Sequence, residues 1–464
     1  MSERRRRREL EEERLREEKR RRRIARERQR RRQVMKQRMI LGAAGILIIL
    51  VVIIAAAVTI HKKNVQAEEA AKAAAQKEAE EEAKKEEERN TLRMVAVGDN
   101  LIHEDLIRAG EERSWNFDFL YENIKSDIEG ADLASVNQET PFVNDHEDVA
   151  GYPDFATPTE VGDALVKAGF DIVTQATEHA YDQETTGILN TVTFWDTEYP
   201  DTALLGIHKE EGDSRVQFIE KKNFKIAVMN YNCMLSENHS IPEENSYMVD
   251  LYSEKSVEED MQEAEDNDAD VKIVFLHGGR DDDSKTDANM EERLNFLAEQ
   301  GVDVVISSHP HILKTYEKLD RPDGGEMLVY YSLGNFANAQ VTPENLLGGM
   351  ADFTIKKDSD SGEISIEDFT LVPLVMHYNS DYSECGVYKL SDYTEQLAQE
   401  HGMHEQTDEE FTLSWLQEKA KEAEPVQTVS GTAVTDSGTS DNGEAADSST
   451  GNSDESNEET GAEE

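Results

Sequence analysis

The apolar positions in the central part of this chain fall into short continuous runs, separated by polar segments. Runs of this kind, rather than strict alternation, are typical of strands buried on both faces in a layered α/β fold. The predicted strands are LRMVAVG (92–98), ADLASVN (131–137), FDIVTQAT (170–177), TALLGI (202–207), FKIAVMNY (224–231), DVKIVFLHG (270–278), VDVVISSH (302–309) and EMLVYYSLGNF (326–336).

Several segments between these runs have the apolar spacing of amphipathic helices, and two of them reach a glycine near their C-terminal end, a common helix stop. Farther along, residues 351–357 and 363–374 alternate more and predict antiparallel strands. The pattern predicts one layered α/β domain over residues 91–392, followed by a polar helical appendage over residues 393–424. The amphipathic segments are 157–170, 256–269 and 290–301.

One apolar run is much longer than the others and predicts a membrane span. Residues 39–60 form a run of 22 consecutive positions, none of which has a charged side chain. As a helix rising ~1.5 Å per residue, this run is about 33 Å long, enough to cross the core of a bilayer. It is too long for the apolar part of a signal peptide, and no convincing cleavage site follows, so we expect an uncleaved anchor. Residues 61–90, rich in Ala, Glu and Lys, predict a charged helical stalk.

Charge is distributed unevenly around this span. The first 38 residues hold 19 of the 49 Lys and Arg residues and 8 of the 99 acidic residues, a net charge of +11 beside −61 for the remainder. Basic residues next to a span stay in the cytoplasm, so we expect a single-pass membrane protein with a cytoplasmic arm (1–38) and an extracellular main domain. Arginine runs also bind nucleic acids. Because Glu is interleaved and the span follows directly, we expect a lipid-facing arm and no nucleic-acid partner.

The remaining composition limits the function further. Residues 425–464 lack the apolar side chains that folding requires and predict a disordered acidic tail. Cys233 and Cys385 could pair outside the cytoplasm, but two cysteines are no disulfide framework, and the sequence has no cysteine-based zinc motif. The negative charge of the exported part argues against binding of free polyanions without a metal ion or a local basic patch.

Several predicted strands run into a carboxylate or a histidine. Asp99, Glu139 and His277 each follow a strand, and His309 and His311 flank a proline on what we expect to be an extended segment. Ligands bind at the carboxyl ends of strands in open α/β sheets, so these side chains are expected to form one cluster with the composition of a divalent-metal site. Each residue alone has an ordinary explanation as a cap or a turn former. The hypothesis of a metal site therefore rests on the occurrence of all these residues together at strand ends.

The order of these motifs resembles that of the CapA-type poly-gamma-glutamate synthesis proteins, whose domain is similar to calcineurin-type metallophosphoesterases. This resemblance covers residues 91–390 and implies an α/β/β/α sandwich of metallophosphoesterase type. The last two of the six shared motifs are the most specific. In order, the motifs are Gly98-Asp99, Asn137-Gln138-Glu139, ATEHAYD (176–182), HGG (277–279), SSHPH (307–311) and YSLGNF (331–336).

The resemblance also implies a metal site that activates water and neutralises charge on a substrate. His179 is expected to act as general acid with Asp182 as its orienting partner, and the alternative for His179 is a buried structural histidine. One or two divalent ions, Mn, Fe or Zn, would be held by Asp99, Glu139, Glu178, His277, His309 and His311.

Three positions depart from the family pattern. Glu178 stands where the family usually has Asn, Gly278 where it has Trp, and Ser307 where it has Gly. A carboxylate at position 178 still ligates a hard cation but adds negative charge, so we expect an altered metal preference. His103 is a further candidate ligand, although we favour a solvent-facing helix residue. The Gly334-Asn335 pair is expected to form a tight turn that closes the pocket.

The sequence therefore predicts a CapA-like protein that acts outside the membrane in making, exporting or attaching poly-gamma-glutamate or a related envelope polymer. Its expected partners are the membrane and the anionic envelope polymer or its biosynthetic membrane complex. The reaction class would be metal-assisted hydrolysis or transfer at a phosphoester or an amide. Two alternatives stay open: a metallophosphoesterase acting on another envelope substrate, and a non-catalytic scaffold that binds polymer.

Overall fold

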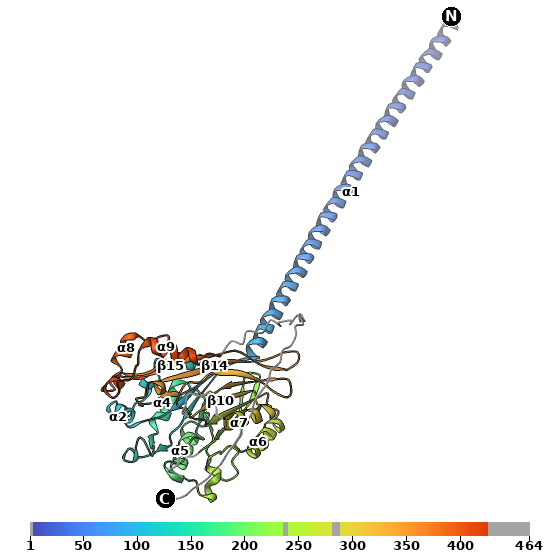
Figure 1. Ribbon diagram of the computed structural model, residues 1–464. Coiled ribbons are helices and arrows are strands. Elements are labelled where there is room, and N and C mark those ends of the chain that lie inside the picture. The colour runs from blue at the N-terminus through green and yellow to red at the C-terminus, as the bar shows by residue number, and fades with distance from the viewer. Residues whose placement is uncertain (1–2, 235–239, 281–287, 426–464) are drawn as a thin grey trace, which may run out of the picture.

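Two β-sheets packed face to face form the body of the protein (Figure 1). The computed structural model describes residues 3–234, 240–280 and 288–425. The strands are β1 (Thr91–Asn100), β2 (Leu133–Gln138), β3 (Phe142–Val143), β4 (Thr157–Pro158), β5 (Ile172–Thr174), β6 (Ala203–Leu205), β7 (Gln217–Lys221), β8 (Phe224–Asn232), β9 (Val271–His277), β10 (Val304–Ser308), β11 (Tyr316–Asp320), β12 (Glu326–Tyr330), β13 (Asn335–Ala337), β14 (Leu347–Lys357), β15 (Ile364–Tyr378) and β16 (Cys385–Lys389).

The two sheets differ in strand direction. The first has the order β16-β15-β14-β1-β2-β5-β6, with β13 also paired to β1. Its β1, β2, β5 and β6 are parallel, whereas β14, β15 and β16 are antiparallel. The alternating segments 351–357 and 363–374 predict this for β14 and β15. The second sheet has the order β11-β12-β10-β9-β8-β7, with parallel β8, β9, β10 and β12 between antiparallel edge strands. Strands β3 and β4 form a separate small pair.

Helices cover the outer faces of both sheets. Apolar side chains of α2, α4, α5, α8 and α9 share one core with the outer face of the first sheet, and those of α6 and α7 share another with the second. A third core fills the space between the sheets, so the predicted α/β/β/α sandwich is confirmed. The helices that follow the long N-terminal one are α2 (Glu104–Glu112), α3 (Lys125–Glu129), α4 (Glu160–Ala168), α5 (Glu184–Glu198), α6 (Glu254–Asp266), α7 (Ala288–Glu299), α8 (Glu395–Glu400) and α9 (Leu413–Glu422).

A single helix, α1 (Glu3–Arg89), holds the predicted basic arm, apolar run and stalk (Figure 1). Its apolar segment makes it long enough and apolar enough to cross a membrane, and none of its residues is buried. At ~1.5 Å per residue the helix is roughly 130 Å long. Its last turn contacts the sandwich where Asn223 donates from its backbone to the carbonyl of Arg89 (3.2 Å) and from its side chain to Glu86 (3.2 Å).

The segment after the last strand packs onto the first sheet. Side chains of Ala398, Met403, Phe411 and Leu416 are buried in the same core as the outer face of that sheet. Thr394 and Thr412 cap α8 and α9 by accepting hydrogen bonds from backbone amides of the first turn, which fixes where each helix starts. The predicted acidic tail lies outside the described residues except for Pro425.

Candidate metal centre

The space between the sheets changes from apolar to polar toward the carboxyl ends of the strands. On β8 the inward-facing residues Ile226 and Val228 are followed by Asn230 and Asn232, and β9 ends in His277 in register with Asn232. A strand alternates its faces, so these side chains lie in one layer above the apolar core. The other members of this layer are Asn137 of β2, Thr174 of β5 and Ser308 of β10.

Asp99 enters this layer through a close approach between two strands. A Cβ on Gly98 would lie 1.8 Å from the carbonyl oxygen of Gly334, so only glycine fits position 98. The amide of Asp99 donates to the same oxygen (3.0 Å), and β1 pairs with β13 through Asp99 and Asn335. The Gly-Asp and Leu-Gly-Asn motifs, more than 200 residues apart, therefore meet at one point, where Asp99 is fully buried.

His309 and His311 do not lie on an extended segment, and this expectation is wrong. Their φ angles are 97° and 57°, in the left-handed region that residues with a side chain rarely adopt. The backbone of His309 is held there because its amide donates to Asp99 Oδ2 (3.1 Å). The turn after β10 keeps the two imidazole rings 5.7 Å apart, centroid to centroid. Strained conformations of this kind are characteristic of binding and catalytic sites.

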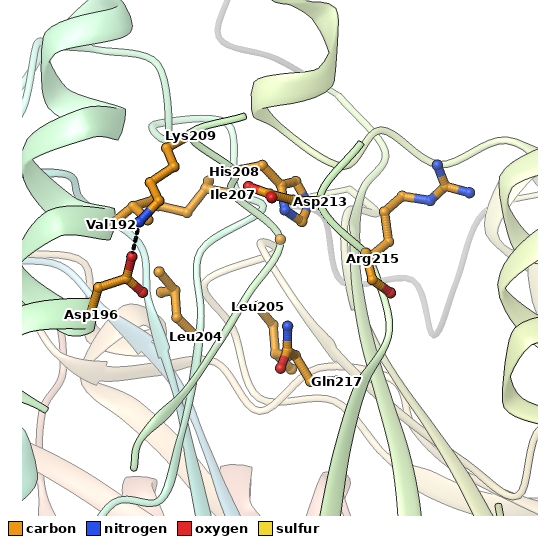
Figure 2. Close-up of a pocket in the computed structure, with 12 residues that line it drawn as sticks. Val192, Asp196, Leu204, Leu205, Ile207, His208, Lys209, Asp213, Arg215 and Gln217 are labelled. Atoms are coloured by element: carbon orange, nitrogen blue, oxygen red, sulfur yellow. Dashed lines mark hydrogen bonds and ion pairs between the residues drawn. The ribbon is translucent and has the colours of Figure 1, made fainter. Parts of the chain in front are cut away.

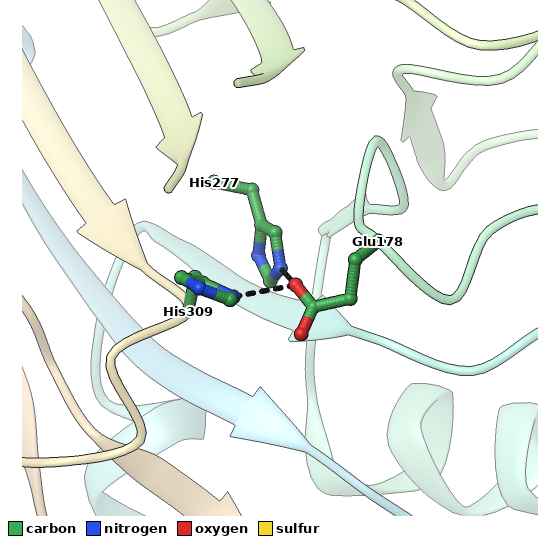
Figure 3. A group of neighbouring side chains, drawn as sticks. All are labelled: Glu178, His277 and His309. Carbon is green, nitrogen blue, oxygen red and sulfur yellow. Dashed lines mark hydrogen bonds and ion pairs between the residues drawn. The ribbon is translucent and has the colours of Figure 1, made fainter. Parts of the chain in front are cut away.

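Glu178 joins two of the predicted ligand histidines. Its Oε2 lies 2.5 Å from Nε2 of His277 and 2.5 Å from Nδ1 of His309 (Figure 3). His277 is the last residue of β9 in the second sheet, whereas Glu178 lies in the loop after β5 of the first sheet. The carboxylate of Glu178 therefore reaches the histidines from the side of the first sheet. The Glu178 side chain is 13% exposed and His277 is fully buried.

The six predicted ligands form one cluster. Ligand atoms lie within 4.8 Å of one another in three groups: Glu178 with His277 and His309, Asp99 with Glu139 and His277, and Glu139 with Glu178 and His311. Three carboxylates and three imidazoles fit Mn, Fe or Zn. Because Glu139, Glu178 and His277 each occur in two groups, the cluster offers overlapping ligand sets for one or two ions.

The electrostatics of the cluster favour ionised carboxylates. Burial alone would raise the pKa of Asp99, but the hydrogen bond and charge of His311 lower it below its ordinary value. Burial opposes protonation of His311, yet Asp99 raises the pKa of His311 to about 9. Burial also raises the pKa of Glu178, and His277 and His309 together outweigh it, so the Glu178 pKa lies well below its usual range. Burial lowers the pKa of His277.

His179 and Asp182, predicted as general acid and orienting partner, lie together beside the cluster. Nδ1 of His179 is 2.7 Å from Oδ2 of Asp182, and the same oxygen accepts the backbone amide of Phe155 (2.9 Å). The ring of Phe155 packs edge-to-face on His179 with 4.8 Å between centroids. The ring of His103 also packs edge-to-face with the ring of Phe155, with 5.3 Å between centroids. His179 is thus fixed in orientation, and its role stays a prediction.

Two residues differ from the expectations for the site. His103 is half-buried, and burial lowers its pKa to about 4, so it is not a solvent-facing helix residue. Asn335 does more than form a turn, because its Oδ1 lies 2.9 Å from Nδ1 of His311. This contact directs the other ring nitrogen of His311 toward Glu139 (3.8 Å). The YSLGNF motif includes this asparagine, but its contact with His311 was not part of the expectation.

The Gly278 departure has a local explanation. A Cβ at position 278 would lie 2.6 Å from the Cβ of Cys233, so the family's usual Trp cannot be placed there without moving the neighbouring strand end. The backbone amide of Cys233 donates to the carbonyl of His277 (2.8 Å), which fixes this close approach. No disulfide joins Cys233 and Cys385 in the described part of the chain.

A second polar pocket, of about 260 Å³, lies between α5 and the segment that joins β6 to β7 (Figure 2). Its cationic side chains are paired within the protein, Lys209 with Asp196 and Arg215 with Asp260 at 2.6 Å, and Asp213 accepts the backbone amide of Glu210 (3.1 Å). His208, also in this wall, lies 2.8 Å from its carboxylate partner Asp250. None of the predicted site residues lines this pocket, so the chemistry predicted from sequence belongs to the cluster between the sheets.

The fold and the cluster together define a two-sheet α/β protein with a candidate metal centre at its strand ends. The sequence model of the family "Bacterial capsule synthesis protein PGA_cap" matches residues 93–340, more than half of the chain. The chain therefore belongs to this family, which confirms the resemblance drawn from the six motifs.

Individual relatives are distant. The PGA biosynthesis protein CapA of Bacillus subtilis (strain 168) is 18% identical over 291 residues, which cover 61% of this chain and 70% of that protein. The capsule biosynthesis protein CapA of Bacillus anthracis is 20% identical over 255 residues, 53% of this chain and 59% of that protein. Among solved structures, the calcineurin-like phosphoesterase YfkN from Bacillus subtilis matches 70% of this chain and 99% of that one, with 12% identity and a TM-score of 0.32.

Proposed function

We propose that this protein is a membrane-anchored, extracytoplasmic, metal-dependent hydrolase or transferase that acts in the synthesis, export or attachment of poly-gamma-glutamate or a related capsule polymer. The observation that carries the proposal is the cluster of six predicted ligands with the His179–Asp182 pair beside it. Membership of the capsule synthesis family supports the polymer as the substrate class. The bond that reacts is a phosphoester or an amide.

Asp99, Glu139, Glu178 and the three histidines would hold the divalent ions. The chemistry that such ions supply is polarisation of an acyl or phosphoryl oxygen and a nucleophile generated from water at neutral pH. The protein's own contribution is a fixed ligand set. Asp99 is held by Asn137, whose side-chain amide donates to Asp99 Oδ1 (2.8 Å), and His277 is held by Ser308 Oγ (2.9 Å). These contacts set the orientation of each ligand before an ion binds.

In this proposal His179 protonates the leaving group. Its Nδ1 is occupied by Asp182, so the proton for transfer is carried on Nε2. The buried carboxylate of Asp182 stabilises the positive charge that the ring carries before it gives up that proton. Phe155 packs against the ring and keeps it from turning away.

The proposal includes a membrane anchor that holds this chemistry outside the cell. In our proposal the apolar part of α1 crosses the membrane once, the basic arm stays in the cytoplasm, and the sandwich lies outside. The proposed partners are the membrane, the anionic polymer and the complex that makes it.

The proposal is tested on the full chain purified in detergent micelles without chelators. Elemental analysis should find about one to two Mn, Fe or Zn per chain, a content reduced in His309→Ala and His311→Ala. Turnover of a generic phosphodiester and of a γ-linked glutamate peptide is then measured with and without added metal. Protein that neither contains metal nor is stabilised by it contradicts the proposal. Metal without any turnover favours a polymer-binding scaffold.

A further inference from the structure

The polar layer between the sheets is almost completely hydrogen-bonded internally. The side chain of Asn137 donates to a carboxylate and accepts from Thr174 (2.8 Å each). Asn230 accepts from one backbone amide (2.7 Å) and donates to one backbone carbonyl (3.3 Å). The hydroxyl of Ser308 lies 2.9 Å from a ring nitrogen of His277. Such complete pairing is what burial of polar groups requires.

Asn232 is the exception in this layer. The residue is 1% exposed, and its Oδ1 accepts the backbone amide of Met234 (3.0 Å), but its Nδ2 has no hydrogen-bond partner among the described residues. Its backbone amide donates to Asp250 and its carbonyl accepts from Tyr252, both at 2.8 Å. The backbone and Oδ1 are therefore fixed, and the amide nitrogen is a buried donor with unused capacity. An unpaired buried donor is destabilising, so it calls for a functional explanation.

The position of Asn232 relates this donor to the metal centre. Asn232 is in register with His277 on the neighbouring strand, and their side chains share the inner face. Neighbouring strands are ~4.8 Å apart, so Asn232 lies directly beside a predicted ligand. An amide NH₂ only donates, so its partner must present an acceptor oxygen.

We infer that Asn232 is a substrate-contacting residue whose Nδ2 donates a hydrogen bond to an anionic oxygen, phosphoryl or carboxylate, of the molecule bound at this centre. The inference rests on the proposed function and adds the residue that recognises the charged end of the substrate. The cluster itself is rich in carboxylates, Asp99, Glu139 and Glu178, which repel an anion. A neutral donor beside them attracts the anionic oxygen without competing for the metal ions.

The test compares Asn232→Asp and Asn232→Ala with wild type. The aspartate keeps the oxygen that accepts from Met234 and puts a charged oxygen in place of the donor, whereas the alanine removes both groups without adding charge. Asn267→Ala, at the exposed end of α6, is the matched control. Each full-length protein is loaded with Mn²⁺ in detergent micelles, its metal content is measured, and binding of inorganic phosphate and of γ-glutamyl-glutamate is followed by calorimetry.

We expect unchanged metal content, and a dissociation constant raised about tenfold or more in both Asn232 variants for the probe that wild type binds, because a hydrogen bond to a charged acceptor is lost. The control should bind like wild type. The two probes distinguish a phosphoryl from a carboxylate substrate. Metal-loaded wild type that binds neither probe, or equal binding by wild type and both variants, overturns the assignment of Asn232. Wild type that takes up no metal overturns the proposed function itself, before any variant is compared.

Discussion

Among single residues, Glu178 is the one whose charge departs from the family pattern within the cluster. One of its oxygens contacts both His277 and His309 at 2.5 Å, so a full negative charge lies where the family usually has a neutral amide. The two imidazoles hold the pKa of Glu178 well below its usual range despite burial. A carboxylate here strengthens binding of hard cations and repels an anionic substrate.

Glu178→Asn should therefore lower metal affinity modestly, by about tenfold, and preserve or raise any hydrolytic rate. Metal affinity is measured by competition with a chelator of known affinity, and turnover is measured at saturating metal so that the two effects separate. Gln262→Asn, on the exposed face of α6 away from the cluster, is the control. If Glu178→Asn changes neither quantity, Glu178 is not a ligand.

His179→Ala should abolish activity with metal still bound. General acid catalysis is worth roughly 10²–10⁴-fold in rate, so the loss should be of that size. Asp182→Asn should give a smaller loss, because the ring stays but loses the carboxylate that orients it. Rates are compared for substrates with good and poor leaving groups, since only the poor ones need a proton. An unchanged rate in His179→Ala would remove it as general acid.

The cluster could be predicted because the carboxyl ends of strands from both sheets lie at the same end of the sandwich. This brings together Asp99 of β1, His277 of β9 and His309, which directly follows β10. Finer features depended on backbone geometry that residue types do not encode. The left-handed turn at His309 arises from the hydrogen bond to Asp99, a contact 210 residues away in sequence. Likewise Asn335 and His103 have ordinary turn and helix-start contexts, and only their tertiary neighbours show their positions.

Among the elements, the segment containing α8 and α9 is the one whose packing depends on uncharged histidines. His377 and His401 are buried with their rings 5.2 Å apart. Burial lowers the pKa of His377 to about 4 and that of His401 to about 3. The neutral hydroxyl of Tyr393 contacts Nδ1 of His377 at 2.8 Å. The charge of His404 disfavours protonation of His401, whereas the carboxylate of Glu400 favours protonation of His377.

The attachment of this segment should therefore weaken in acid. Both folded-state pKa values lie below the unfolded value of about 6.5, so the stabilisation is complete above pH 6.5 and is lost as pH falls toward 4. For His377 alone the loss amounts to about 3 kcal/mol. Hydrogen exchange of residues 395–422 should accelerate between pH 6.5 and 4 after correction for the intrinsic rate. His377→Phe should reduce this pH dependence, whereas His146→Asn, at an exposed site, should leave it intact.

The buried parallel strands could be predicted because most of their residues are apolar, and β14 and β15 were predicted in part from the alternating segments 351–357 and 363–374. The short strands β3, β4 and β13 have two or three residues and no periodicity to detect. Helix α5 was also missed, since its sequence ETTGILNTVTFWDTE is rich in threonine and has no clear amphipathic pattern. Burial supplies the stability that its helix propensity lacks: Trp195 packs in the core on the outer face of the first sheet, and Ile188 packs in a separate cluster with Tyr181 and Ile207.

For the whole molecule, the direction in which the chain crosses the membrane is the decisive property. The charge difference across residues 39–60 predicts the arm inside and the sandwich outside. Protease added to intact cells or spheroplasts should remove everything beyond His61 and leave a protected fragment that carries a tag on the arm. The control is the same digestion after detergent lysis, which should destroy the tagged fragment too. Protection of the sandwich in intact cells would contradict this orientation.

The end of the sandwich at which α1 enters determines what the cluster can reach. Helix α1 runs into the start of β1, whereas Asp99 lies at the far end of that 10-residue strand. A strand of this length spans ~33 Å, and the helical stalk from His61 to Arg89 adds roughly 44 Å. With the rod upright, the centre stands some tens of ångströms off the lipid surface and faces away from it. In the proposed topology, headgroups in the bilayer would be out of range, and a substrate would have to extend from the membrane to reach the cluster.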